Sequence, residues 1–272
     1  MRFTIIVVAL NAGEELKKTV DSILCQTYTD YEIIVKDGGS VDGSLEALPG
    51  DRHIKLIKRS DKGIYDAMNQ AVIKMRGDYV LFLNCGDYLK NGKVLARVAK
   101  AVAKSHADIY YGDLYRREQD STDIAPGRIS DFVCYRNVPC HQVCFYSRRL
   151  FSKRAYLTKY TVRSDYEHFL YCVYSENAHC EYIPLTICSY QGGGFSETEE
   201  HRKEAALEHK EITEHYLGKK TLIYRLIMIL TLQPLREKLA QSASFSKIYH
   251  GVKGLLYGRK TGGNKNEGIV DM

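Results

Sequence analysis

Cysteine is sparse in this sequence and shows no paired spacing. Eight cysteines are scattered over 272 residues, and most lie in apolar runs, so a disulfide-stabilised scaffold is excluded. We therefore expect reduced thiols in the core of a cytosolic protein. The densest group is Cys134, Cys140, His141 and Cys144, which lacks the C-x-x-C pairs of a zinc site, so a metal centre there is the weaker interpretation.

Long hydrophobic runs are also missing. No stretch of 18 apolar residues occurs, so we expect no simple membrane-spanning helix. The apolar run of residues 3–10 is short and leads into a pattern typical of a helix start, so we expect no signal peptide. The G-x-G-x-x-G spacing of dinucleotide-binding proteins is absent as well, because the glycines of "VKDGGSVDGS" are spaced differently.

Composition and charge predict one globular body with a basic tail. The hydrophobic fraction of 44% and the charged fraction of 26% are ordinary for a globular protein. The net charge of +6 is unevenly placed, because residues 218–260 contain nine Lys or Arg and one Glu, whereas the first 217 residues sum to −1. We predict a globular domain over residues 1–217, a basic amphipathic helical tail over 218–260 and a disordered end over 261–272.

Strand and helix patterns alternate in the first half of the chain. Apolar strand patterns cover residues 3–10, 31–36, 53–58, 78–84 and 107–115, and helical patterns cover residues 13–26, 63–75 and 93–104. Strands that are apolar on both faces and separated by helices predict an α/β fold with a mostly parallel sheet covered by helices on two sides. Asp42 or Ser44 is expected to cap a further helix after the second strand.

Residues 115–217 are less regular. The predicted elements are a strand entering a short helix within 137–151, a helix over 164–176 with Ser164 as its N-cap, a strand over 180–190, and a charged helix from about Glu199 to Leu217. In the tail, residues 221–234 are apolar, and later apolar residues recur at helical spacing among Lys and Arg. Such a tail fits an anionic membrane surface, and packing on the body or on a second subunit is the alternative.

Three acidic turns follow three predicted strands. Asp37, Asp61 and Asp87 come after the second, third and fourth strands, and ligands of open α/β sheets bind at the carboxyl ends of the strands. Asp37 lies in a glycine-rich loop and can accept hydrogen bonds from a nucleobase or ribose. In "SDKGIYDAMNQAV" the N–H groups at a helix start, together with Lys62, favour an anion, and Asn69 is a polar residue beside an apolar stripe.

Six motifs follow one another along the chain: "TIIVVALN", "SILCQTYTDYEIIVKDGGSVDGS", "SDKGIYDAMNQAV", "GDYVLFLNCGD", "HQVCFYSRRLF" and "RSDYEHFL". Their order resembles the family 2 glycosyltransferases, above all the bacterial polysaccharide-assembly branch. The resemblance covers roughly residues 1–195. It implies a GT-A fold with a Rossmann-like sheet, here followed by a C-terminal helical appendage, a nucleotide-sugar donor and inversion at the anomeric carbon.

The resemblance also suggests roles for single residues. It implies Asp165 as the general base, with Glu167 as the rival, and Asp87 as the ligand of a divalent cation, Mg²⁺ or Mn²⁺, although Asn84 stands where the family usually has an acidic residue. His141 and Gln142 are expected to line the pocket. The expected donor-binding residues are Asn11, Asp37, Asp61, Lys62, Asn69 and Asn84.

The expected function follows from this resemblance and from the tail. It is inverting transfer of a sugar to a lipid-linked saccharide, in capsule, O-antigen or exopolysaccharide synthesis, by a cytoplasmic protein held peripherally at the inner face of the cytoplasmic membrane. A nucleotidyltransferase and a non-catalytic protein that binds nucleotide-sugars or nucleic acid are the alternatives. The net charge of −1 on the body counts against nucleic acid as a partner, and a homo-oligomer stays open.

Overall fold

The computed structural model describes residues 1–192 and 198–230. The middle of the glycine-rich segment, the basic amphipathic helix predicted after Pro234 and the predicted disordered end lie outside the described residues. Within the described part of the chain, no helix is long and apolar enough to cross a lipid bilayer.

The described strands form one mixed sheet in the order β3-β2-β1-β4-β8-β6-β9-β5, with β7 paired to β6. Their bounds are β1 Phe3–Ala9, β2 Tyr31–Asp37, β3 Ile54–Lys58, β4 Tyr79–Asn84, β5 Tyr88–Leu89, β6 Ile109–Arg116, β7 Ser121–Asp123, β8 Cys144–Ser147 and β9 Cys180–Tyr190. The first four strands in this order are parallel, as predicted. β8 lies between β4 and β6 and is antiparallel to both. The strand predicted at residues 107–115, which is β6, is therefore not paired directly with the parallel strands.

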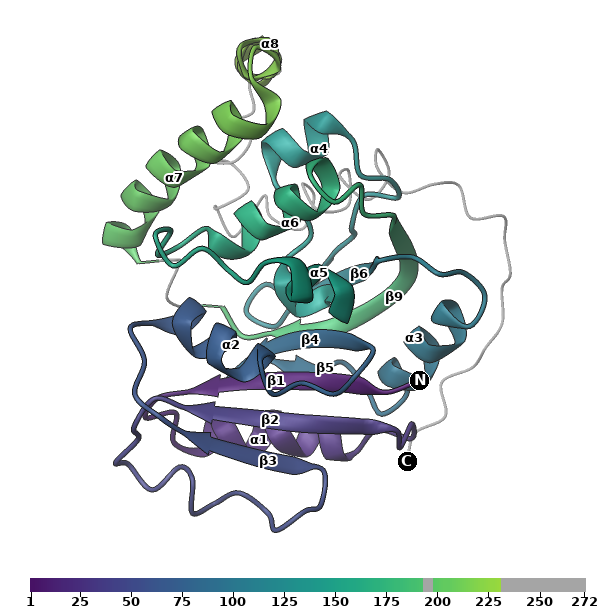
Figure 1. The fold of residues 1–272 in the computed structure, drawn as a ribbon, viewed down its shortest axis with the longest axis vertical. Coiled ribbons are helices and arrows are strands. Elements are labelled where there is room, and N and C mark those ends of the chain that lie inside the picture. Colours follow the sequence, from purple (N-terminus) through teal and green to yellow (C-terminus); the bar gives the residue numbers. More distant parts are fainter. Residues whose placement is uncertain (193–197, 231–272) are drawn as a thin grey trace.

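Helices cover both faces of the sheet, and two further helices extend away from it (Figure 1). Their bounds are α1 Glu14–Leu24, α2 Ile64–Val72, α3 Val94–Val102, α4 Asp131–Arg136, the 3-10 helix η1 His141–Val143, α5 Arg148–Lys153, α6 Ser164–Tyr174, α7 Glu199–Leu217 and α8 Lys220–Leu230. α7 packs on α4 and α6, and α8 packs on α7 and α4. α7 belongs to the body predicted over residues 1–217, and α8 is the described part of the C-terminal helical appendage. The predicted fold class is confirmed.

The core lies on the central parallel strands. Almost every side chain of β1, β2 and β4 is buried, because both faces of these strands are covered, which explains their nearly continuous apolar sequences. Three polar residues interrupt β2 inside this core, namely Glu32, Lys36 and Asp37. A buried polar side chain is tolerated only where it finds a hydrogen-bond partner, so these positions mark a network in the sheet.

Two local predictions are wrong. No helix follows Asp42 or Ser44, since the described residues 38–53 form turns and bends, and the Asp42 carboxylate instead accepts hydrogen bonds from the backbone N–H of Gly13 (2.8 Å) and of Ser44 (3.1 Å). Ser164 does not cap α6, because its hydroxyl donates to the Leu157 carbonyl oxygen (2.8 Å). In both cases a tertiary contact uses the side chain that local sequence assigned to a cap.

Candidate active site

Two adjoining cavities open near the carboxyl ends of the parallel strands. The larger, about 700 Å³, is lined by the residues that follow β1, by the segment from Asp61 to Ala67 and by part of α7. The smaller, about 380 Å³, contains Asn84, Asp87, His141 and Asp165 among its lining residues. Ile64, Tyr65 and Cys85 line both cavities, so the two spaces meet at the start of α2 and the end of β4.

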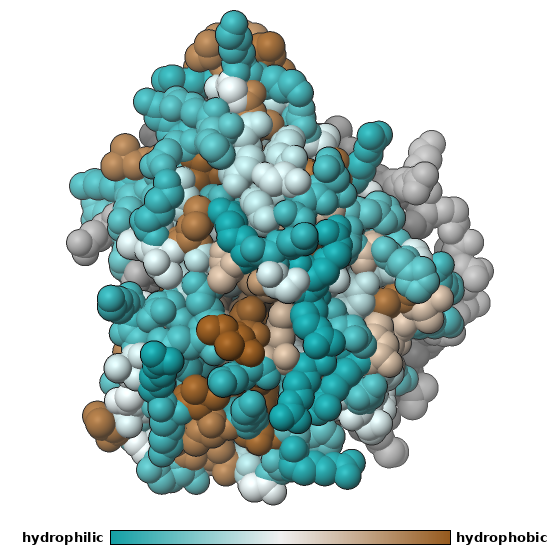
Figure 2. Space-filling view, in the orientation of Figure 1, coloured by the Kyte–Doolittle hydropathy of each residue, from teal (hydrophilic) through white to brown (hydrophobic). Residues whose placement is uncertain are grey.

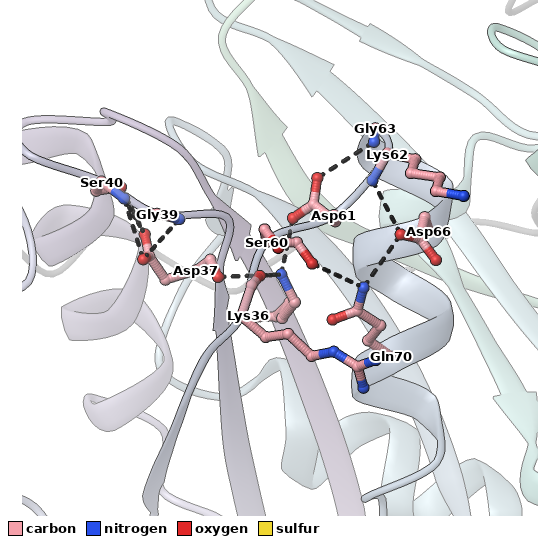
Figure 3. A network of polar contacts seen from close by, with 11 residues as sticks. Lys36, Asp37, Gly39, Ser40, Ser60, Asp61, Lys62, Gly63, Asp66 and Gln70 are labelled. Atoms are coloured by element: carbon pink, nitrogen blue, oxygen red, sulfur yellow. Dashed lines mark hydrogen bonds and ion pairs between the residues drawn. The ribbon is translucent and has the colours of Figure 1, made fainter.

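The loops after β2 and β3 are joined by one polar network at the edge of the larger cavity (Figure 3). Asp37 is 1% exposed, and its carboxylate accepts hydrogen bonds from its own loop, from Gly39 N–H (2.9 Å) and from the N–H and hydroxyl of Ser40. Lys36 forms an ion pair with Asp61 (Nζ to Oδ2, 2.7 Å). Gly38 permits this approach, because a Cβ atom there would lie 2.9 Å from Asp61 Oδ2.

The start of α2 is not a free anion site. The Asp61 carboxylate accepts a hydrogen bond from Gly63 N–H (3.2 Å), and the Asp66 carboxylate accepts one from Lys62 N–H (2.9 Å). These carboxylates occupy N–H groups that the sequence suggested for an external anion. The Lys62 side chain is exposed and lines the larger cavity, so its ammonium remains the cationic group at this position.

In the smaller cavity the Asp165 carboxylate is held from two sides. Its Oδ1 accepts a hydrogen bond from the Tyr65 hydroxyl, and its Oδ2 lies by His141 Nδ1, both at 2.8 Å. Burial alone would raise the pKa of Asp165, but the hydrogen bonds from His141 and Tyr65 outweigh burial, so the pKa lies below its ordinary value. Because an ionised carboxylate can only accept, Nδ1 of His141 carries the hydrogen. The side chain stays 23% exposed.

Asn84 ends β4, Asp87 follows it, and both line the same cavity as Asp165. Asp87 is 3% exposed and accepts hydrogen bonds from Gln142 Nε2 and from Gln191 N–H, each at 3.1 Å. Burial raises the pKa of Asp87, although these two donors oppose the shift. Asn84 Nδ2 lies 3.5 Å from His141 Nε2, while Asn84 Oδ1 is buried with no hydrogen-bond partner in the described structure. A carboxylate and an orphaned amide oxygen are ligands that Mg²⁺ and Mn²⁺ accept, so the residues fit such a cation.

The described residues do not form a metal site from protein ligands alone. Among residues 1–192 and 198–230, no three His, Cys, Asp or Glu side chains lie close enough to hold a metal ion. A cation at Asp87 and Asn84 would therefore take its remaining ligands from substrate oxygens and water, as Mg²⁺ commonly does.

Four other predicted residues, Asp37, Asn11, Asn69 and Glu167, lie outside both cavity linings, and the Asp37 carboxylate is used within its own loop. Asn11 accepts a hydrogen bond from Val41 N–H (3.0 Å) and so holds the loop after β2. Asn69 exchanges two hydrogen bonds of 2.9 Å with the backbone of Tyr156. Glu167, the rival base, is 3% exposed and pairs with Arg154 (2.7 Å), so its carboxylate is used in packing α6.

Sequence reasoning missed several residues of the site. Tyr65, Arg116 and Arg163 line the smaller cavity, and Lys36 anchors the network of Figure 3. Glu208 of α7 is 8% exposed and accepts hydrogen bonds from the backbone N–H groups of Thr161 (2.7 Å), Val162 (3.1 Å) and Arg163 (2.7 Å). These three residues lead directly into α6, so Glu208 fixes the turn that carries Asp165. In the sequence, Glu208 resembles the other charged residues of this helix, which are expected to face solvent, and no pattern indicates that it is buried.

The family model for "Glycosyl transferase family 2" matches residues 4–173, more than half of the chain. The chain belongs to this family. A "PGL/p-HBAD biosynthesis glycosyltransferase" of Mycobacterium bovis is 34% identical over 207 residues, which are 72% of this chain and 79% of the relative. "Glycosyltransferase GlyA" of Streptococcus pneumoniae is 33% identical over 118 residues, covering 42% of this chain and 17% of that protein.

Solved structures share the fold of this family 2 glycosyltransferase. The mannosyltransferase PcManGT of Pyrobaculum calidifontis, in complex with GDP-Man and Mn²⁺, superimposes with a TM-score of 0.63 at 16% identity over 95% of this chain and 88% of that one. S. aureus TarS 1–349 in complex with UDP-GlcNAc gives a TM-score of 0.61 at 16% identity over 80% and 72%. The chain spans 60% of another matched TarS 1–349 structure. These likenesses establish the GT-A fold.

We predict that Glu208→Gln slows the enzyme. Glutamine keeps the size of the side chain but places an NH₂ group against backbone N–H donors, so the turn before Asp165 shifts. We expect the turnover of a nucleotide-sugar to fall by about ten- to hundredfold, as small misplacements of catalytic groups do. Glu214→Gln is the matched control, because Glu214 lies on the same helix, is 57% exposed and lies 3.9 Å from Lys210 of that helix. Equal turnover in the two variants would contradict this role of Glu208.

Proposed function

We propose that this family 2 glycosyltransferase is an inverting enzyme that transfers a sugar from a nucleotide-sugar donor to an acceptor hydroxyl. The observation that carries the proposal is the Asp165 carboxylate, which faces the smaller cavity and is kept ionised by His141 and Tyr65. The complexes of TarS with UDP-GlcNAc and of PcManGT with GDP-Man support a nucleotide-sugar as the donor class.

The proposed reaction is a single displacement. The acceptor oxygen attacks the anomeric carbon, the bond from that carbon to the diphosphate breaks, and the proton of the acceptor hydroxyl passes to Asp165. The donors on both carboxylate oxygens orient this base, and the remaining lone pairs stay available to the hydroxyl. We assign the nucleoside diphosphate to the larger cavity, where Lys62 offers positive charge to the leaving group.

We propose Asp87, with Asn84, as the site of a divalent cation. The unpartnered Asn84 Oδ1 and the Asp87 carboxylate supply oxygen ligands at the cavity. A bound Mg²⁺ or Mn²⁺ would neutralise negative charge on the diphosphate. Gln142 and the backbone of Gln191 hold Asp87 in place for this role. The Mn²⁺ complex of PcManGT supports the choice of metal.

We propose a lipid-linked saccharide as acceptor, in the assembly of a cell-surface polysaccharide at the inner face of the cytoplasmic membrane. Support comes from α8, which exposes large apolar side chains: Leu222, Ile223, Leu226, Ile227, Ile229 and Leu230. Figure 2 shows apolar side chains gathered at the end of the molecule that α8 forms. Lysine and arginine are frequent in the sequence around and beyond this helix, and such a combination favours anionic lipid surfaces.

The reaction class is tested by its products. We expect the wild-type protein, incubated with a panel of nucleotide-sugars and a divalent cation, to release a nucleoside diphosphate from one of them. Asp165→Asn should reduce this release by about 10²–10⁴-fold, the usual contribution of a general base, and should leave the dissociation constant of the nucleoside diphosphate nearly unchanged.

Asp21→Asn serves as the control, since Asp21 is an exposed residue of α1 that pairs with Lys17. Release of pyrophosphate would instead identify a nucleotidyltransferase. Retained turnover in Asp165→Asn with weakened nucleotide binding would remove Asp165 from the role of base.

A second prediction concerns the cation. Titration calorimetry of the nucleoside diphosphate that binds best should give tighter binding with Mn²⁺ than without, and Asp87→Ala should abolish this difference. Asp21→Ala should preserve it. The assigned site would be refuted if Mn²⁺ did not change the nucleotide affinity of the wild-type protein. It would also be refuted if Asp87→Ala kept the full effect of Mn²⁺ on that affinity.

A third prediction concerns α8. The double variant Leu226→Glu, Leu230→Glu places charge on exposed apolar positions, so it should weaken cosedimentation of the full chain with vesicles that contain anionic phospholipid. Leu207→Glu, on the exposed face of α7, is the control and should behave as wild type. Unchanged vesicle binding of the double variant would argue against α8 as the membrane contact.

A further inference from the structure

A lysine ammonium lies buried where the loops after β2 and β3 meet. The Lys36 side chain is fully buried, and its Nζ donates to the carbonyl oxygen of Asp37 (3.0 Å), to that of Arg59 (2.6 Å) and to Asp61 Oδ2 (2.7 Å). Figure 3 shows this ammonium reaching toward Asp61 from β2. An ammonium carries three hydrogens, so these three acceptors use all of them.

The three acceptors belong to the end of β2 and to the loop after β3, and of these residues only Asp61 lines the larger cavity. Asp37 begins the loop that its carboxylate closes on Ser40, while Arg59 and Asp61 belong to the loop after β3. Asp61 in turn restrains the start of α2, because its other carboxylate oxygen accepts a hydrogen bond from Gly63 N–H. Asp61, Lys62 and Gly63 line the larger cavity, whereas Lys36 does not. Lys36 therefore acts on that cavity through Asp61 and the loop backbones.

The choice of a lysine at this position is not explained by stability. The three preceding residues of β2, Ile33, Ile34 and Val35, are apolar and fully buried, so an apolar side chain would suit the strand. Replacing a buried ion pair by apolar residues is often neutral or stabilising, because burial of the two charges is costly. What an apolar residue could not do is hold the Asp61 carboxylate in one orientation and tie both loops together.

We propose that Lys36 is a positioning residue of the donor site, which sets the Asp61 carboxylate and the two adjoining loops in the geometry that binds a nucleoside diphosphate. The inference rests on the proposed function, in that it takes the larger cavity as the place of the donor nucleotide. It adds a fully buried residue that lines neither cavity and is not among the site residues expected from the sequence.

A double-mutant cycle on the full chain tests the inference. The variants are Lys36→Met, Asp61→Asn and the two combined, and Lys55→Met on β3 is the control. The probes are UDP, GDP, ADP, CDP and dTDP, measured by calorimetry with Mn²⁺. For the nucleotide that wild type binds best, we expect Lys36→Met to weaken binding by about tenfold, as loss of a supporting residue does. The Lys55→Met control should stay near the wild-type value.

The cycle separates positioning from stability. Lys36→Met leaves Asp61 without its cation and is expected to melt at a lower temperature, whereas the double variant removes the unpaired charge and should recover stability. Nucleotide binding should not recover in the double variant and should be no weaker than in the poorer single variant. In steady-state release assays, the loss should appear in KM for the donor more than in kcat, because Asp165 is held by other residues.

The outcomes that overturn the inference are distinct from failure of the proposed function. Nucleotide affinity of folded Lys36→Met or of the double variant within twofold of Lys55→Met would refute the positioning role. Fully additive losses in the cycle would also refute it, because Lys36 would then not act through Asp61. If the wild-type protein bound none of the five nucleotides, both the proposed donor site and the proposed function would be refuted.

Discussion

The parallel register of β1, β2 and β4 is the constraint on which the site depends. In this register Ala9 of β1 lies beside Asp37 of β2, and Val8 lies beside Asn84 of β4. The strands therefore end at one level, and the residues that follow them reach one region of space. Because both faces of these strands are buried, a slip of one residue would exchange the side chains packed on the two faces and would separate Lys36 from Asp61, so side-chain packing and this ion pair favour the observed alignment.

Bringing charged groups to the ends of buried strands carries a cost in desolvation, and the fold offsets it with partners from distant parts of the chain. Asp87 receives donors from Gln142 and Gln191, and Asp165 receives them from Tyr65 and His141. Each donor lies on a different element from its acceptor. The same hydrogen bonds that compensate burial also fix the orientation of the carboxylates, so satisfying buried polar groups and preorganising the site are one physical requirement.

Local pattern was sufficient to predict the alternating elements, and the family resemblance pointed to seven residues that line the cavities: Asp61, Lys62, Asn84, Asp87, His141, Gln142 and Asp165. Asp61, Asn84, Asp87, His141 and Asp165 follow strands or open helices, and the fold brings such positions to one edge. The hydrogen-bond partners of the buried polar side chains could not be predicted from the sequence. Nothing local reveals that the Asn69 amide is used by Tyr156, 87 residues away, or that Lys36 in an apolar strand points inward to Asp61 rather than to solvent.

The candidate site extends beyond the segment that the family model matches. The residues proposed for chemistry and for the cation lie within the segment matched by the family model, whereas α7 lies beyond it. Yet α7 contributes His201 and Glu204 to the larger cavity and Ala205 to the smaller, and Glu208 holds the turn before Asp165. The end of β4 positions Asp87, α2 and η1 hold Asp165, and α7 fixes the turn that precedes the proposed base. α7 is therefore a structural part of the candidate site, because its residues line both cavities.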